Sequence, residues 1–207
     1  MNLTAMLVTL PVLIFSIVLH EVAHGLAALY FGDDTAKNEG RLTLNPIAHL
    51  DLFGSIILPA LCLILHAPVF AWAKPVPFNT YNLRPERLGT LCVTLAGIAA
   101  NLAIAIVAGL GIRLLMKFSP AGAFSEAILS LLGSLVYLNL LLAIFNLLPI
   151  PPLDGWRLWG VWIPAELRMR IESNAMIGFM LLIVLVQFLP ISMLVSWAFN
   201  LLVGLPL

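Results

Sequence analysis

Long apolar stretches alternate with short polar connectors along the 207 residues of the chain. There are about five, each near or above the roughly 20 residues that a helix needs to cross a bilayer. The pattern predicts an all-α polytopic membrane protein, with one domain over residues 1–207 and with a turn and a short strand-like loop, Arg41 to Leu44, after the first helix. The apolar stretches run from Leu3 to Phe31, Leu52 to Ala73, Leu88 to Leu115, Ala127 to Leu148 and Ala175 to Leu205.

Composition supports this fold class. Hydrophobic residues make up 62% of the chain and charged residues 10%, against roughly 25% charged residues in soluble domains. We therefore expect the lipid bilayer to surround most of the protein. The formal net charge is zero, so charge gives no indication of a nucleic-acid partner. The oligomeric state is left open by the sequence.

The first apolar stretch contains the motif His20-Glu21-Val22-Ala23-His24. On a helix the two histidines lie one turn apart on one face, with Glu21 beside them. Two imidazoles for one metal ion and a neighbouring carboxylate base are typical of zinc hydrolases. Ionisable side chains at membrane depth normally line a functional cavity. The plainer alternative is a pair of hydrogen-bonded helix histidines beside a glutamate that reaches toward water.

A catalytic zinc ion takes three protein ligands and keeps one position for water. The third ligand must therefore come from elsewhere in the chain. A di-iron carboxylate site would instead need a second Glu-x-x-His motif, which the other glutamates do not provide. The residues alone leave four candidates for the third zinc ligand, namely His49, Asp51, His66 and Asp154.

A second motif narrows this choice through a resemblance. The stretch from Asn146 to Gly155, Asn-Leu-Leu-Pro-Ile-Pro-Pro-Leu-Asp-Gly, resembles the second signature of the site-2 protease family of intramembrane zinc metalloproteases. The stretch from Ala96 to Asn101 is similar to another motif of this family, although Ile98 stands where the family has proline. The chain looks like a short bacterial branch of the family that lacks appended soluble domains.

The resemblance implies a function and a set of site residues. Asp154 would be the third ligand, with His20 and His24, of one Zn²⁺ ion per chain, and Glu21 would be the general base. Asn146 would lie near the scissile bond, and we expect Asn146 or Asn101 to contact the substrate or the oxyanion. The implied activity is that of an intramembrane zinc endopeptidase acting in or near transmembrane segments of membrane proteins. The alternatives are a proton- or ion-handling transporter or channel and a catalytically silent membrane scaffold.

Topology gives a separate expectation. If every apolar stretch crossed once, Asp154 and the histidines would lie on opposite faces of the membrane. A re-entrant hairpin over Leu52 to Ala73, broken at Pro59 and Pro68, would bring them to one face. Because basic residues favour the cytoplasmic side, we then expect the active site nearer the cytoplasmic face of the cell membrane, in a bacterium the inner membrane. Eight of the ten basic residues share the active-site face in this arrangement, with only Arg113 and Lys117 opposite.

Overall fold

The computed structural model describes residues 3–57, 61, 64, 73–118, 123–173, 178, 180, 184 and 188–204. Three long helices dominate it, α1 (Leu3–Tyr30), α4 (Glu86–Phe118) and α5 (Ala123–Asn146). No strand occurs among the residues that the structure describes. The shorter helices are α2 (Thr35–Asn38), α6 (Asp154–Gly160), α7 (Ala165–Glu172) and α9 (Ile191–Val203), with the 3₁₀ turns η1 (Pro46–His49) and η3 (Thr80–Asn82) and the π-helical turn η2 (Leu52–Ile57).

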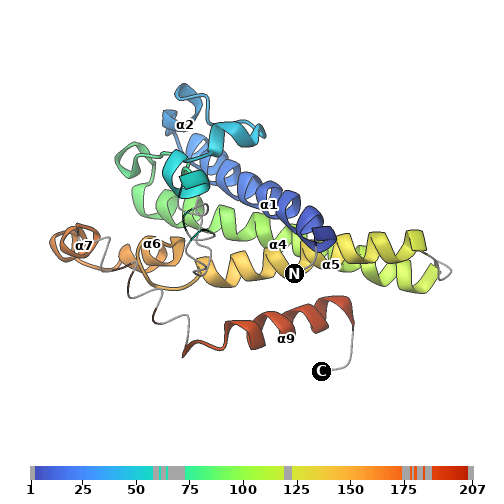
Figure 1. The fold of residues 1–207 in the computed structure, drawn as a ribbon. Coiled ribbons are helices and arrows are strands. Elements are labelled where there is room, and N and C mark those ends of the chain that lie inside the picture. Colours follow the sequence, from blue (N-terminus) through green and yellow to red (C-terminus); the bar gives the residue numbers. More distant parts are fainter. Residues whose placement is uncertain are drawn as a thin grey trace.

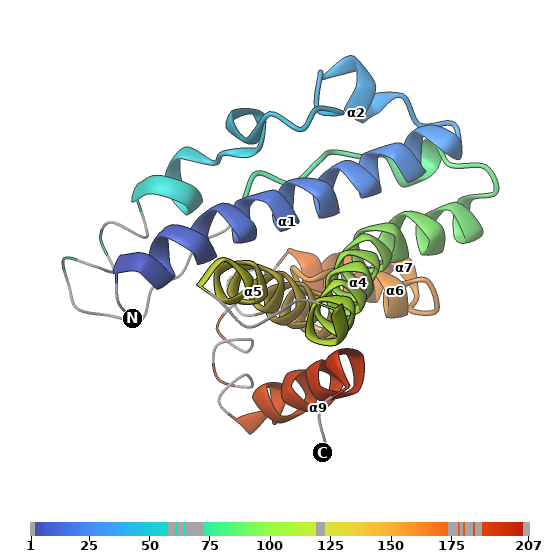
Figure 2. The ribbon, with the colours of Figure 1, turned by 90° about the vertical axis from the view of Figure 1, so that its right-hand side faces the viewer.

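The helices pack in layers. Helices α4 and α5 lie side by side, α1 crosses them on one side, and α9 packs on the other side (Figures 1 and 2). The short helix α6 contacts α4. Small and branched apolar side chains fill the space between α4, α5 and α9, including Ala108, Val136 and Val195. This core fixes the helix pair against which α1 presents its histidines.

Three helical segments are long and apolar enough to cross a membrane, judged by length and composition. They are Val8–Tyr30 within α1, the whole of α4, and Glu126–Asn146 within α5. Their outer faces are apolar and open, as Val107 on α4 shows with 70% of its surface exposed. Such a surface fits lipid rather than water. The prediction of an all-helical membrane protein is thus confirmed at this level.

The other two apolar stretches are only partly described. Most of Leu52 to Ala73, which includes the predicted hairpin, lies outside the described residues. Of the last stretch, α9 begins at Ile191, directly after Pro190. With 13 residues α9 is shorter than the roughly 20 needed for a span.

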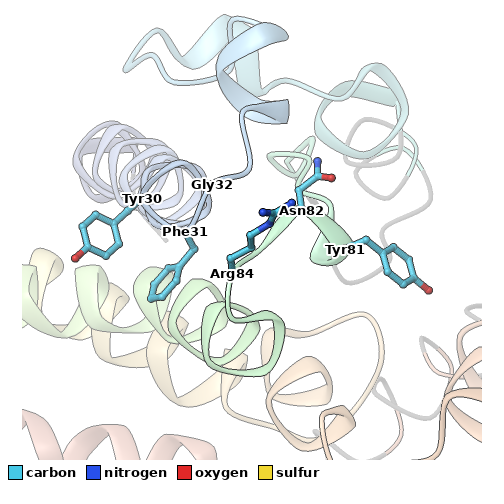
Figure 3. A pocket seen from close by; sticks show the side chains of 6 residues that line it. All are labelled: Tyr30, Phe31, Gly32, Tyr81, Asn82 and Arg84. Carbon is cyan, nitrogen blue, oxygen red and sulfur yellow. The ribbon is translucent and has the colours of Figure 1, made fainter.

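A backbone hydrogen bond links the residue after α1 to the segment that precedes α4. The backbone N–H of Arg84 donates to the carbonyl of Phe31 at 2.9 Å. A shallow surface pocket lies at this junction and is lined by both segments (Figure 3). Tyr30 and Tyr81 extend away from it in opposite directions and are 85% and 82% exposed. The chain between α1 and α4 therefore leaves and re-enters the helix bundle at the same end.

The short strand predicted after the first helix is not formed. Residues 41–45 run between α2 and η1 without regular structure. Arg41 is buried, with 5% of its surface exposed, and its guanidinium donates a hydrogen bond to the carbonyl of Lys74 at 2.8 Å. Tertiary contacts thus decide the conformation that the local Arg-Leu-Thr-Leu alternation failed to predict.

Candidate metal centre

The histidines of the first motif project from α1 toward one point. Their Nε2 atoms lie 3.0 Å apart, and the two rings meet edge to face. Both side chains are buried, with 7% of His20 and 5% of His24 exposed. The one-turn spacing on α1 therefore delivers two imidazole nitrogens to a single enclosed place, as the sequence predicted.

Asp154 completes a triangle of donor atoms. It is the first residue of α6, and its Oδ2 lies 3.0 Å from Nε2 of His20 and 3.1 Å from Nε2 of His24. Ligands about 2.0 Å from a tetrahedral zinc ion are about 3.3 Å from one another. These three atoms are the one group of at least three His, Cys, Asp or Glu ligands found among the described residues. The donor set and its spacing fit Zn²⁺.

The other ring nitrogens set the direction of the imidazoles. Nδ1 of His24 donates to the backbone carbonyl of Val93 at 2.7 Å. Because a carbonyl only accepts, the neutral His24 ring carries its proton on Nδ1 and leaves the Nε2 lone pair for a metal. Nδ1 of His20 pairs with Oδ1 of Asn101 at 2.8 Å. Two groups on α4 thus hold the Nδ1 atoms of both rings and fix the orientation of their Nε2 atoms.

The charge of Asp154 suits a ligand. Burial alone would raise the pKa of its carboxyl group, but the facing His20 and His24 side chains outweigh burial and hold that pKa below its usual range. The carboxyl group is therefore ionised at neutral pH. With the Nε2 protons displaced, an anionic oxygen and two imidazole nitrogens would face one point, which is a donor set that suits a divalent cation.

Two glycines make room for this arrangement. A Cβ atom on Gly97 of α4 would lie 2.5 Å from Nε2 of His24 and 2.7 Å from Cε1 of His20. A Cβ atom on Gly155 would lie 2.3 Å from the carbonyl oxygens of Leu147 and Leu148. Only glycine lets α4 approach the imidazoles and lets α6 fold back onto the end of α5.

Glu21 lies beside the triangle. Its Oε2 accepts a hydrogen bond from the backbone N–H of Val76 at 2.6 Å. Val76 belongs to a segment without regular secondary structure, residues 73–79, that precedes η3 and α4. This contact could not be predicted from the sequence, because a backbone N–H carries no residue-specific signal.

The remaining candidates from the sequence lie elsewhere or engage other groups. His49 is buried, but its Nε2 donates to the carbonyl of Thr43 at 2.8 Å. Asp51 accepts the N–H of Gly54 at the start of η2, and His66 falls outside the described residues. The Nδ2 atom of Asn146 donates to the carbonyl of Leu142 within α5. Neither His49 nor Asp51 belongs to the metal-binding group.

Comparison with known proteins agrees with this geometry. The chain is 41% identical over 190 residues to "Putative zinc metalloprotease YwhC" of Bacillus subtilis (strain 168), covering 89% of this chain and 82% of that protein. The model of Peptidase family M50 matches residues 111–188. The chain belongs to peptidase family M50. This is the site-2 protease family that the motifs indicated, so the predictions of a metalloprotease and of zinc are confirmed.

Two less similar relatives are also named as putative zinc metalloproteases, in both cases Rip2. Rip2 of Mycolicibacterium smegmatis (strain ATCC 700084 / mc(2)155) is 31% identical over 172 residues, which cover 83% of this chain and 63% of that protein. Rip2 of Mycobacterium tuberculosis (strain ATCC 25618 / H37Rv) is 36% identical over 141 residues, covering 68% and 51%. No solved structure matches the chain significantly. M50 membership does not support the transporter or silent-scaffold alternatives.

Three contributors to the candidate metal centre were missed by sequence reasoning. They are the carbonyl of Val93, the N–H of Val76 and the absent side chain of Gly97. Only Gly97 could have been noticed in the sequence, because a glycine inside a helix is costly and indicates that another part of the protein approaches the helix closely there. The sequence does not say what approaches it.

Proposed function

We propose that this chain is an intramembrane zinc endopeptidase that hydrolyses peptide bonds in or near transmembrane segments of membrane proteins. The observation that carries the proposal is the buried triangle of His20, His24 and Asp154 on helices that include membrane-spanning ones. Zinc bound there would supply a Lewis acid and would lower the pKa of a bound water to about 7. The protein side chains supply the rest of the chemistry.

Glu21 is the general base in this proposal. It follows His20 directly on α1, so its carboxylate lies next to the metal ligands without joining them. It takes the proton of the attacking water and passes it to the leaving amine. The role requires a carboxylate within one hydrogen bond of the water, and the position of Glu21 on α1 supports that geometry.

The two asparagines take different parts. Asn101 is fully buried and pairs with His20, which favours a role in holding the ligand rather than the substrate or oxyanion contact expected from the sequence. Asn146 ends α5 and is half-buried, eight residues before Asp154. We retain the proposal that Asn146 contacts the substrate or the oxyanion, because its amide lies at the end of the segment that leads to the third ligand.

The substrate must expose its backbone to this site. A transmembrane helix uses its carbonyls in internal hydrogen bonds, so it must unwind locally before hydrolysis. Substrates with helix-weakening residues near the membrane face are therefore favoured. We propose single-span membrane proteins as the substrate class.

The proposed topology is supported by the end of the helix bundle at which α1, α4, α5 and α6 meet. Helix α1 ends, α4 begins and α6 follows α5 at the end that holds the metal site. The chain between α1 and α4 leaves and returns there, which supports the re-entrant hairpin over Leu52 to Ala73. We propose that this end faces the cytoplasm across the cell membrane, because most basic residues lie on it. The exposed Tyr30 and Tyr81 suit the interface with lipid headgroups.

The proposal is tested with purified protein in detergent and a synthetic transmembrane peptide. We expect zinc-dependent cleavage, its loss with a chelator and its recovery when zinc is restored. Glu21→Gln should bind zinc normally but cleave about 1,000-fold more slowly. Asp154→Ala should lose zinc. Full cleavage by the Glu21→Gln protein would refute the mechanism, and unchanged zinc affinity in Asp154→Ala would refute the ligand set.

A further inference from the structure

Residues 73–78 have no regular secondary structure and contact both α1 and α6 beside the metal site; we call this segment the connector. At one end the guanidinium of Arg41 donates to the carbonyls of Lys74 and Pro75, at 2.8 and 3.3 Å. The N–H of Lys74 donates to the carbonyl of His49 at 2.9 Å. The connector is thus attached to the loop that follows α1.

The other end of the connector reaches the helix that carries Asp154. The Phe78 ring lies under the guanidinium of Arg157, with 4.7 Å between the guanidinium carbon and the ring centroid. Arg157 is on α6, three residues after Asp154. The connector therefore contacts both α1, which carries the histidines, and α6.

Between these attachments lies the contact with Glu21. Val76 stands between Pro75 and Pro77, which have no N–H, so it holds the one backbone donor of this tripeptide. That donor goes to Oε2 of Glu21 at 2.6 Å. The Val76 side chain is also packed closely on α1, since a Cβ atom on Gly25 would lie 2.9 Å from it. Both the backbone and the side chain of Val76 are therefore fixed relative to Glu21.

Arg41 indicates that this arrangement is rigid. Its side chain is 5% exposed, and burying a guanidinium is costly unless it is hydrogen-bonded. Its partners are the two carbonyls directly before Val76. Movement of the connector would leave a buried cation without these acceptors, so the Arg41 contacts favour one fixed position for the Val76 N–H.

We propose that Val76, held in place by Arg41, is a positioning residue for the catalytic base. The inference rests on the proposed role of Glu21. A carboxylate with one oxygen held by a backbone N–H can no longer rotate freely, so its second oxygen keeps one direction for the attacking water. Precise placement of this kind matters, because an error of about 1 Å in a reacting group can lower the rate about 100-fold.

The test removes the backbone donor of Val76. Val76→Pro deletes the N–H, and the substituted residue keeps an extended backbone because it precedes Pro77. Val76→Ala keeps the N–H and is the matched control. With the zinc-loaded full-length protein and a synthetic transmembrane peptide of about 20 apolar residues, we expect kcat to fall about 100-fold in Val76→Pro. KM and zinc content should stay unchanged in Val76→Pro, and Val76→Ala, which loses side-chain packing but keeps the N–H, should lower kcat much less than Val76→Pro does.

A second pair of variants, at Arg41, tests the hydrogen bond between Val76 and Glu21 indirectly. Arg41→Met removes the buried cation and all its donors, whereas Arg41→Lys keeps a charged donor for the carbonyls of Lys74 and Pro75. We expect kcat about tenfold lower in Arg41→Met, with partial recovery in Arg41→Lys and normal zinc content in both. This pair decides the matter if Val76→Pro does not fold.

Three outcomes would overturn the inference. These are an unchanged kcat in a folded, zinc-loaded Val76→Pro protein, an increase in kcat, which would make the connector an inhibitory occupant of the site, and equal effects of Val76→Pro and Val76→Ala. Failure of the proposed function is distinguishable, because in that case the zinc-loaded wild type would not cleave the peptide, and failure of the Glu21 role would leave cleavage intact in Glu21→Gln. The inference fails separately if Glu21→Gln abolishes cleavage while the Val76 and Arg41 variants do not change kcat.

Discussion

The two ends of the helix bundle are held together by different forces. At the site end, buried polar side chains such as His24, Asn101 and Arg41 each have a specific partner. At the opposite end, α4, α5 and α9 meet mainly through apolar side chains such as Ala108 and Val195, and the polar contact there, Arg113 on carbonyls of α9, is exposed. Hydrogen bonds depend on direction, whereas apolar packing depends mainly on volume. Substitutions at the site end should therefore change metal binding and rate, and those at the opposite end mainly stability.

The largest expected effect comes from the glycine that faces the imidazoles. In Gly97→Ala the new methyl group would lie 2.5 Å from Nε2 of His24, so the ligands must turn away from one another. We expect zinc affinity to fall about 100-fold or more, with cleavage lost in parallel. Gly133→Ala on α5 is the control, because no atom lies within 4 Å of its new methyl group. Competition with a chelator measures the affinity, and wild-type affinity in Gly97→Ala would contradict the packing argument.

A smaller effect is expected from the residue behind His20. Asn101 and Asn139 are both fully buried, but Asn101 pairs with His20 and Asn139 donates to Ser16. Asn101→Leu should weaken zinc binding about 10- to 100-fold, since partners of metal ligands typically contribute this much. Asn139→Leu should leave zinc affinity unchanged and alter only thermal stability. Equal losses of affinity in both variants would mean that burial, not the His20 contact, is what matters.

Local features of the molecule could be predicted from the sequence, and contacts between distant residues could not. Long apolar stretches predict spanning helices, and the His20 to His24 spacing predicts two ligands on one face, because both are local patterns. Asp154 lies 130 positions from His24, so only the resemblance to a known motif selected it. The carbonyl of Val93 and the N–H of Val76 could not be selected at all, because every non-proline residue has both groups.

The strand predicted from Arg41 to Leu44 was wrong because contacts between distant segments cannot be read from a local pattern. The alternation from Arg41 to Leu44 is a local signal for a strand, but Arg41 is buried against Lys74, 33 positions away. Contacts between distant segments decide such short pieces of chain. Helices as long as α4 are less sensitive to them, because their hydrogen bonds are internal and hydrophobic surroundings favour that state.

The smallest expected effect is at the loop that anchors the end of the connector region. Asp33 is fully buried after α1 and accepts hydrogen bonds from Thr35, Asn79 and Asn82. Burial alone would raise its pKa, but these hydrogen bonds outweigh burial and lower the pKa below its ordinary value. The ionised carboxylate therefore stabilises the folded state above the unfolded pKa of about 4, and this contribution is lost as pH falls through the lower folded pKa.

Asp33→Asn removes this contribution at every pH. Relative to wild type we expect it to lower stability by about 2 kcal/mol at pH 7, the typical worth of a hydrogen bond to a charged group, and by progressively less below about pH 4. Asp34→Asn is the control, because the Asp34 side chain is exposed and makes no capping hydrogen bond. Thermal unfolding in detergent between pH 7 and pH 3 measures the difference. If the Asp33→Asn deficit stays constant over this range, or if Asp34→Asn shows the same deficit, the ionised Asp33 does not anchor the loop. Zinc-dependent cleavage at pH 7 and low temperature should be nearly unchanged in Asp33→Asn, because Asp33 contacts Thr35, Asn79 and Asn82 rather than a metal ligand.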